Sequence, residues 1–166
     1  MVAITAGTGS TLKSTTAEAV LAECLDYLQL QETTSTRNPN LRDYVRINYD
    51  CNSYLFSSTF NFPYLQSQNS LGEKVSSVPD YLSGVTFSPG TGGTFKSINP
   101  AAFAFEVATF LDIAERDASK NPTSQNRISL TEDSERLIVS ATVTLPFILA
   151  LNTDGTRKIT ITPYLT

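Results

Sequence analysis

Residues 137–162 read LIVSATVTLPFILALNTDGTRKITIT, and this stretch decides the fold class. Over 137–145, apolar side chains alternate with Ser and Thr, which is the two-residue period of a half-buried β-strand. The apolar run continues past Pro146, where we expect a bulge or a bend because proline cannot donate a ladder hydrogen bond. The turn residues at 152–155 and the alternation over 159–162 then predict an antiparallel return strand.

Two amphipathic helices are predicted upstream of this region. Thr15 and Glu18 have the spacing of a capping box, and the apolar residues that follow recur at helical spacing. The second helix begins with Asn99 as its N-cap and Pro100 at its first position, where the missing N–H costs nothing. We expect it to extend to about Ser119.

Other short alternating or apolar runs complete the predicted fold. Strands are expected over 45–49, 54–62, 85–87, 94–98 and 128–130, with a hairpin tip at 90–93 and a long irregular loop at 63–83. Because no strand–helix–strand rhythm is present, the class is α+β. The sequence predicts a mainly antiparallel β-sandwich or barrel of about seven strands with two amphipathic helices.

The chain has 166 residues, the size of one domain. Residues 1–14 are rich in Gly, Ser and Thr and predict an extended N-terminal arm, followed by a single α+β domain over 15–166. Such an arm is usually mobile unless something holds it. We therefore expect it either to contact a neighbouring subunit or to lie along its own domain.

The composition excludes several classes of function. The chain contains no His, but 22 Thr and 18 Ser, and its charged fraction of 17% is low for a soluble domain. The net charge of −4 and the scattered basic residues argue against nucleic-acid binding. No run reaches the roughly 18 apolar residues of a membrane span, and the N-terminus lacks a signal-peptide pattern, so cytoplasmic synthesis is expected.

Motifs that would carry chemistry are incomplete. Residues 7–14 resemble a phosphate-binding loop, but Leu12 stands where that loop needs its second glycine. Catalytic triads and His-based metal sites cannot form without histidine. Cys24 lies in the apolar stripe of the first helix and reads as a buried hydrophobe, and Cys51 forms no metal-binding pair with it. We therefore expect no cofactor, no metal and no catalytic residue.

In composition and predicted architecture the whole chain resembles small virion proteins of tailed bacteriophages, such as tail-tube, connector or capsid-decoration subunits. No residue motif carries this resemblance. It implies a non-enzymatic structural subunit of a virion that binds copies of itself and other structural proteins. The contacts would lie on the arm, the 63–83 loop, the 90–93 tip and the polar face of the second helix, at Thr8, Ser10, Leu12, Tyr64, Leu71, Tyr81, Thr91 and Phe105.

Two alternatives come from other classes of function. Thr-faced strands with tyrosines are typical of carbohydrate-binding β-modules, although the chain contains no Trp, the preferred stacking residue. A hydrolase that uses a pair of carboxylates needs no histidine, and the 16 acidic residues allow many such pairs. A cleft with two acids within hydrogen-bond reach would favour the hydrolase.

Overall fold

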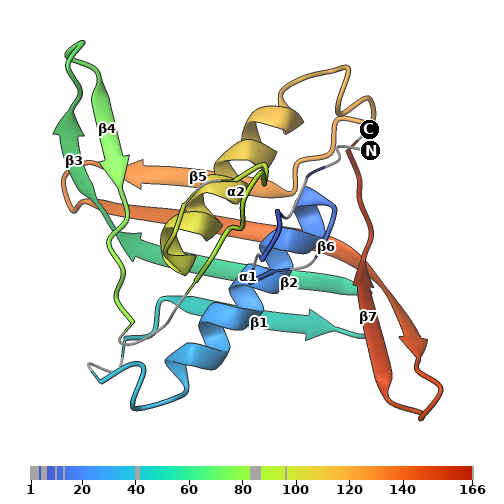
Figure 1. Ribbon diagram of the computed structural model, residues 1–166. Coiled ribbons are helices and arrows are strands. Elements are labelled where there is room, and N and C mark those ends of the chain that lie inside the picture. The colour runs from blue at the N-terminus through green and yellow to red at the C-terminus, as the bar shows by residue number, and fades with distance from the viewer. Residues whose placement is uncertain are drawn as a thin grey trace.

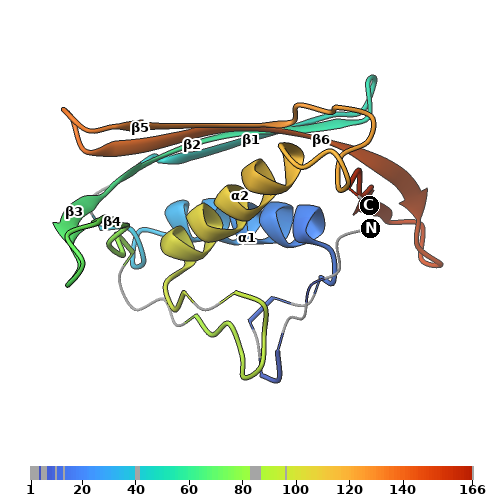
Figure 2. The same ribbon diagram turned by 90° about the horizontal axis from the view of Figure 1, so that it is seen from above.

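The computed structural model describes residues 4, 7–9, 11–12, 14–39, 42–82, 87–95 and 97–165. Helices α1 (Ala17–Glu32) and α2 (Pro100–Glu115) pack on one face of an antiparallel sheet and leave the other face uncovered (Figures 1 and 2). The predicted α+β class with antiparallel strands is confirmed. The sheet is open and single-layered, however, so the expected sandwich or barrel is wrong: the helices, and not a second sheet, bury the apolar face.

The main sheet is built around two long central strands. Its order is β1-β2-β6-β5, and β7 pairs with the far end of β6. A separate two-stranded ribbon is formed by β3 and β4. The strands are β1 (Val45–Asp50), β2 (Leu55–Pro63), β3 (Leu65–Gln68), β4 (Lys74–Ser77), β5 (Ile128–Asp133), β6 (Ile138–Leu151) and β7 (Arg157–Ile161).

Alternation of side chains explains why the sheet has one buried face. In β2, Phe56, Phe60 and Phe62 are fully buried beneath the helices, whereas Thr59 and Asn61 between them face solvent. The long strand β6 alternates in the same way, as predicted for 137–145. Its register runs through Pro146 with no extra residue, so the bulge expected there is absent.

One of the two helices begins as predicted and the other does not. Asn99 caps α2, accepting a hydrogen bond from the N–H of Ala102 at 2.8 Å, as predicted. Helix α1 is capped by Thr16, one residue after the predicted cap. The capping-box prediction is wrong because Glu18 is fully buried and accepts hydrogen bonds from the backbone of the C-terminal segment instead.

Two predicted loop regions also change. The stretch 63–83 is not irregular, since it contains the β3–β4 ribbon; β3 is exposed along its length, so no alternation of polarity marks it. The described part of the predicted 85–98 hairpin forms no strand beyond a single bridge between Thr91 and Thr8. Residues 85, 86 and 96 lie outside the described residues. The arm lies along its own domain: Ile4 and Leu12 are buried in the core.

The two halves of the chain repeat one another with an offset of 83 residues. Helices α1 and α2 have 16 residues each and begin at positions 17 and 100, and β1 and β5 have six residues each and begin at 45 and 128. The sequences 1–83 and 84–166 align without a gap and are identical at 21 of the 83 positions. The left-handed Tyr54 before β2 has its equivalent in Leu137 before β6.

The halves are related by an internal two-fold axis. In the antiparallel pairing of β2 with β6, Thr59 lies opposite its own equivalent, Thr142. On the other side of the helices, Thr8 and Thr91, also equivalent, exchange two backbone hydrogen bonds of 3.1 Å. A residue that pairs with its own equivalent lies on the symmetry axis. The chain is therefore built like a symmetric dimer whose two subunits have been joined.

Candidate assembly surfaces

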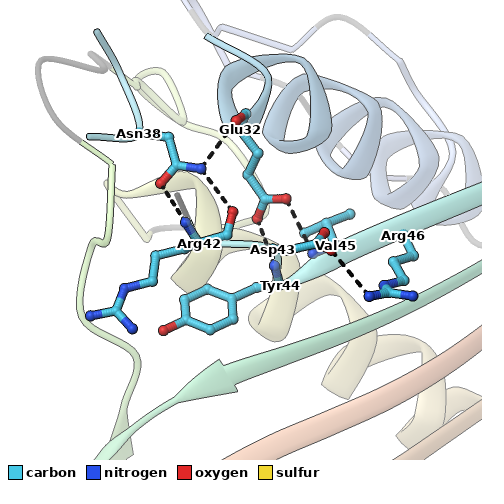
Figure 3. Close-up of polar contacts among 7 residues, drawn as sticks. All are labelled: Glu32, Asn38, Arg42, Asp43, Tyr44, Val45 and Arg46. Atoms are coloured by element: carbon cyan, nitrogen blue, oxygen red, sulfur yellow. Dashed lines mark hydrogen bonds and ion pairs between the residues drawn. The ribbon is translucent and has the colours of Figure 1, made fainter. Parts of the chain in front are cut away.

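A buried joint connects each helix to the sheet, and Figure 3 shows the one after α1. The carboxylate of Glu32, the last residue of α1, accepts hydrogen bonds from the N–H groups of Tyr44 at 3.1 Å and Val45 at 3.4 Å. The side-chain amide of Asn38 donates to the carbonyls of Glu32 and Arg42, and its oxygen accepts from the N–H of Arg42. One glutamate and one asparagine thus tie the end of α1 to the start of β1.

The second half forms the same joint with equivalent residues. Glu115 accepts from the N–H groups of Arg127 at 2.8 Å and Ile128 at 3.4 Å. Asn121 donates to the carbonyls of Glu115 and Gln125 and accepts from the N–H of Gln125. The Asn-Pro sequences at 38–39 and 121–122 mark both joints.

A tyrosine closes each joint from the far end of its own half. The phenolic O–H of Tyr81 donates a hydrogen bond to a carboxylate oxygen of Glu32, and that of Tyr164 donates one to Glu115. The distance between the two oxygens is 2.5 Å in each case. Burial, together with the adjacent carboxylate, raises the pKa of both phenols, while burial raises the pKa of Glu32 despite the hydrogen bonds it accepts. These acids are committed to backbone N–H groups and phenols of the chain itself. Tyr81, predicted as a contact residue, acts mainly inside this joint.

Two predicted contact residues prove to be core residues. Leu12 and Tyr64 are buried against the hydrophobic core of their own chain and offer no side-chain surface to a partner. Their assignment to partner binding is therefore corrected: the arm and the ribbon base are apolar anchors of the fold. Ser10 lies outside the described residues.

The remaining predicted contact residues reach the surface. Thr8 and Thr91 are exposed, although their backbones bond to each other across the two-fold axis. Leu71 is 82% exposed at the turn between β3 and β4. Phe105 is half-buried and packs partly against the core. The structure does not bring these residues together at one place.

Two equivalent open grooves lie where a helix of one half meets the ribbon of the other half. The α1 groove, between α1 and β7, has a volume of about 450 Å³, and the α2 groove, between α2 and the end of β4, has about 490 Å³. Seven equivalent pairs line both: Ser14 and Ser97, Ala19 and Ala102, Ala22 and Phe105, Glu23 and Glu106, Asp26 and Thr109, Thr160 and Ser77, Ile161 and Val78.

The grooves share one feature and differ in the rest. Glu23 accepts a hydrogen bond from the N–H of Ser14, and Glu106 accepts one from the N–H of Ser97, both at 3.1 Å. In the α1 groove, Asp26 also accepts from the phenol of Tyr49 at 2.6 Å. Burial raises the pKa of Asp26, the tyrosine bond opposes that shift, and Glu23 adds to it. The α2 groove has no such acid–phenol pair among its lining residues.

The uncovered face of the sheet is polar and carries little charge. Its two central strands present alternate residues outward, and Ser140 donates to Asn61 across them at 2.7 Å. The outward residues are Arg46, Asn48, Asp50, Leu55, Ser57, Thr59, Asn61, Pro63, Ser129, Thr131, Asp133, Ile138, Ser140, Thr142, Thr144 and Pro146, of which three are charged. A flat neutral surface of hydroxyl and amide groups can be covered by a partner at lower desolvation cost than a charged one.

The described residues form no metal-binding cluster and no membrane-spanning helix. Among the described residues, no three His, Cys, Asp or Glu side chains are grouped so that they could hold a metal ion. Neither described helix is long and apolar enough to cross a membrane. Comparisons with protein-family models, with curated proteins and with solved structures find no match to the chain.

Sequence reasoning missed the grooves because their residues come from both halves. Val78 and Phe105 in the α2 groove, and Ile161 and Ala22 in the α1 groove, lie on segments far apart in the sequence, and no local motif joins them. A self-comparison of the sequence would have pointed to them. The stretch GTGSTLKS at 7–14 recurs as GTGGTFKS at 90–97, and each copy leads into the helix that lines a groove.

Proposed function

We propose that this chain is a non-enzymatic structural subunit of a multi-protein assembly, working through contacts with copies of itself and with other structural proteins. The observation that carries the proposal is the internal two-fold repeat. It gives the chain two ribbons at opposite ends and two sheet edges (Figure 1), and it also gives two equivalent grooves. Paired surfaces at opposite ends let each subunit join two neighbours, as growing or closed assemblies require.

Exposed apolar side chains at the ends of the molecule support the same proposal. They include residues on the ribbons and beside the α2 groove: Leu65, Leu71, Ile98, Leu151 and Ile159. Apolar clusters of this kind on a domain surface are typical of protein contact sites. The neutral, hydroxyl-rich surface elsewhere favours close packing without strong charge repulsion.

The class of assembly we propose is a bacteriophage virion, with a tail or connector position ahead of a capsid-decoration position. Support for this assignment comes from the composition and from the size and α+β build of the chain. The subunit would be synthesised in the host cytoplasm and would need no cofactor.

The test is the mass of the protein in solution and its binding to candidate partners. Light scattering coupled to size exclusion, at several protein concentrations, is expected to give masses above the 18.1 kDa of one chain. Virion structural proteins encoded beside it are expected to bind it as well. A strict monomer that also ignores those partners would contradict the proposal.

A further inference from the structure

The two ribbons differ on the side that continues from the hydrophobic core. In β6 and β7 this inner side begins with the buried Phe147 and Ile161 and extends outward. The next inner positions are apolar in the β6–β7 ribbon and polar at the equivalent places in the β3–β4 ribbon: Leu149, Leu151 and Ile159 against Gln66, Gln68 and Ser76.

The apolar side chains on this ribbon are only partly covered by their own chain. Leu149 packs against the core, but Leu151 is 71% exposed and Ile159 is 38% exposed. The equivalent glutamines show that a ribbon of this shape does not need apolar residues there to fold. Their presence on one ribbon therefore indicates a contact outside the chain.

The α2 groove has gained apolar surface as well. Ile98, at its rim, is 76% exposed, and its equivalent in the other half is Thr15. Phe105 lines the groove where the α1 groove has Ala22. The apolar ribbon thus lies beside the α1 groove, and the α2 groove with Ile98 and Phe105 lies beside the polar ribbon.

We infer that the β6–β7 ribbon of one copy docks in the α2 groove of a second copy, placing Leu151 and Ile159 against Ile98 and Phe105. This inference deepens the proposed function and rests on it. Two departures from the repeat support the pairing: the ribbon and the groove each expose apolar side chains that their equivalents lack, and because one chain carries both surfaces, a second copy supplies the partner for each.

The position of the two surfaces decides what this contact builds. The β6–β7 ribbon lies at the opposite end of the molecule from β3 and β4 (Figure 1), and the α2 groove lies between α2 and the end of β4. A contact between two different surfaces is heterologous, so each copy binds one neighbour at either end. Repeating it gives a closed ring or a filament, not a two-fold dimer.

The internal repeat supplies the substitutions for a test. The ribbon variant carries Leu151→Gln and Ile159→Ser, and the groove variant carries Ile98→Thr and Phe105→Ala; each change introduces the residue found at the equivalent position. We expect each variant to weaken self-association about tenfold or more, measured by sedimentation over a concentration series, because each removes apolar area from the contact.

Mixing the two variants gives the decisive result. The ribbon variant keeps an intact groove and the groove variant keeps an intact ribbon, so an equimolar mixture should form a heterodimer and stop there. Ile148→Gln is the matched control: Ile148 is 59% exposed on the opposite side of the same ribbon and should leave assembly unchanged. Thermal unfolding of each variant shows whether the fold is retained.

The outcomes separate this inference from the proposed function. Assemblies that form normally in both folded variants, or a mixture that stays monomeric, overturn the docking contact and leave the proposed function standing. An equal loss of self-association with Ile148→Gln also overturns it, because assembly would then not depend on the side of the ribbon that carries Leu151 and Ile159. A wild-type protein that is monomeric but binds other virion proteins overturns only this inference, whereas a monomer that binds none overturns both.

Discussion

The two halves of this chain agree at the joints where each helix turns into the sheet, and they differ at the ends, where ribbon meets groove. Glu32 and Asn38 have identical residues at the equivalent positions, with the same hydrogen-bond partners. By contrast, the positions equivalent to Leu151 and Ile98 in the first half are occupied by Gln68 and Thr15. Residues that fold the chain are needed twice, whereas surface residues are free to diverge when the two ends contact different surfaces.

The largest expected loss of stability comes from removing the N-terminal arm, which meets its equivalent segment at the internal two-fold axis. Deleting residues 1–13 removes the buried Ile4 and Leu12 and the bridge between Thr8 and Thr91, while the equivalent segment must remain because it connects the halves. We expect a loss of about 3–6 kcal/mol in the free energy of unfolding, since each buried apolar side chain contributes about 1.5–3 kcal/mol. Urea unfolding measures this loss. Unchanged stability would mean that the arm does not belong to the core.

The joints should respond equally in both halves. Asn38→Ala and Asn121→Ala each remove three hydrogen bonds of a buried amide and leave part-buried backbone groups without these partners. We expect a loss of about 3 kcal/mol for each, from the cost of unsatisfied buried polar groups. Two unfolding curves that differ by more than 1 kcal/mol would argue against equivalent joints. Asn69→Ala, at the exposed turn between β3 and β4, is the control for loss of an asparagine outside a joint.

Much of the fold could be predicted from the sequence because its signals are local. The period of β6, the cap of α2 at Asn99 and Pro100, and the apolar stripe of α1 each lie within one short segment. Glu18 was misassigned because its partners, the N–H groups of Tyr164 and Leu165, are far away in the sequence. A cap pattern and a buried long-range acceptor look alike in sequence.

The site was harder to predict for the same physical reason. Leu12 and Tyr64 lie in polar-looking segments, and their burial depends on contacts with the opposite half. Leu71 is exposed at a turn, whereas Phe105, placed on the polar face by helical spacing, is half-buried against the core. The grooves could be predicted only from the internal repeat. That repeat becomes visible when the sequence is compared with itself at an offset of 83 residues.

The acid in the first joint predicts a pH dependence. Glu32→Gln should cost about 2 kcal/mol at neutral pH, because an amide cannot accept hydrogen bonds at both of the carboxylate positions. Burial raises the pKa of Glu32 above its usual 4.5, so the folded chain holds this proton more readily than the unfolded chain. Stability from this group is present at low pH and falls as pH rises from 4.5 through the folded pKa.

The measurement is urea unfolding of wild type and Glu32→Gln over a pH series. The gap between the two proteins is expected to narrow as pH rises through that window and then to stay constant. Asn38→Ala changes no ionisable group and should shift stability by the same amount at every pH. A gap that widens with pH would reverse the sign of the predicted linkage.

A comparable or smaller effect is expected where the N-terminal arm packs against its equivalent segment in the second half, near Pro89. Gly7 has φ +87°, and a Cβ there would lie 2.9 Å from the carbonyl oxygen of Pro89, in the opposite half. Gly9 has φ +79° with open space around the added atom. Gly7→Ala should therefore cost about 2 kcal/mol, and Gly9→Ala about 1 kcal/mol from backbone strain alone. Equal losses in thermal unfolding would show that this contact tolerates a methyl group.

The smallest stability effect belongs to the ends, where the halves diverge. Leu151→Gln should change the free energy of unfolding by less than about 0.5 kcal/mol, because the side chain is largely exposed and a glutamine occupies the equivalent place in the other ribbon. The same substitution should still weaken self-association. Chemical unfolding at a concentration where the protein is monomeric measures the first quantity without the second. A loss of stability as large as that of Asn38→Ala would place Leu151 among the residues that fold the chain, and the contrast between retained joints and divergent ends would then fail at this position.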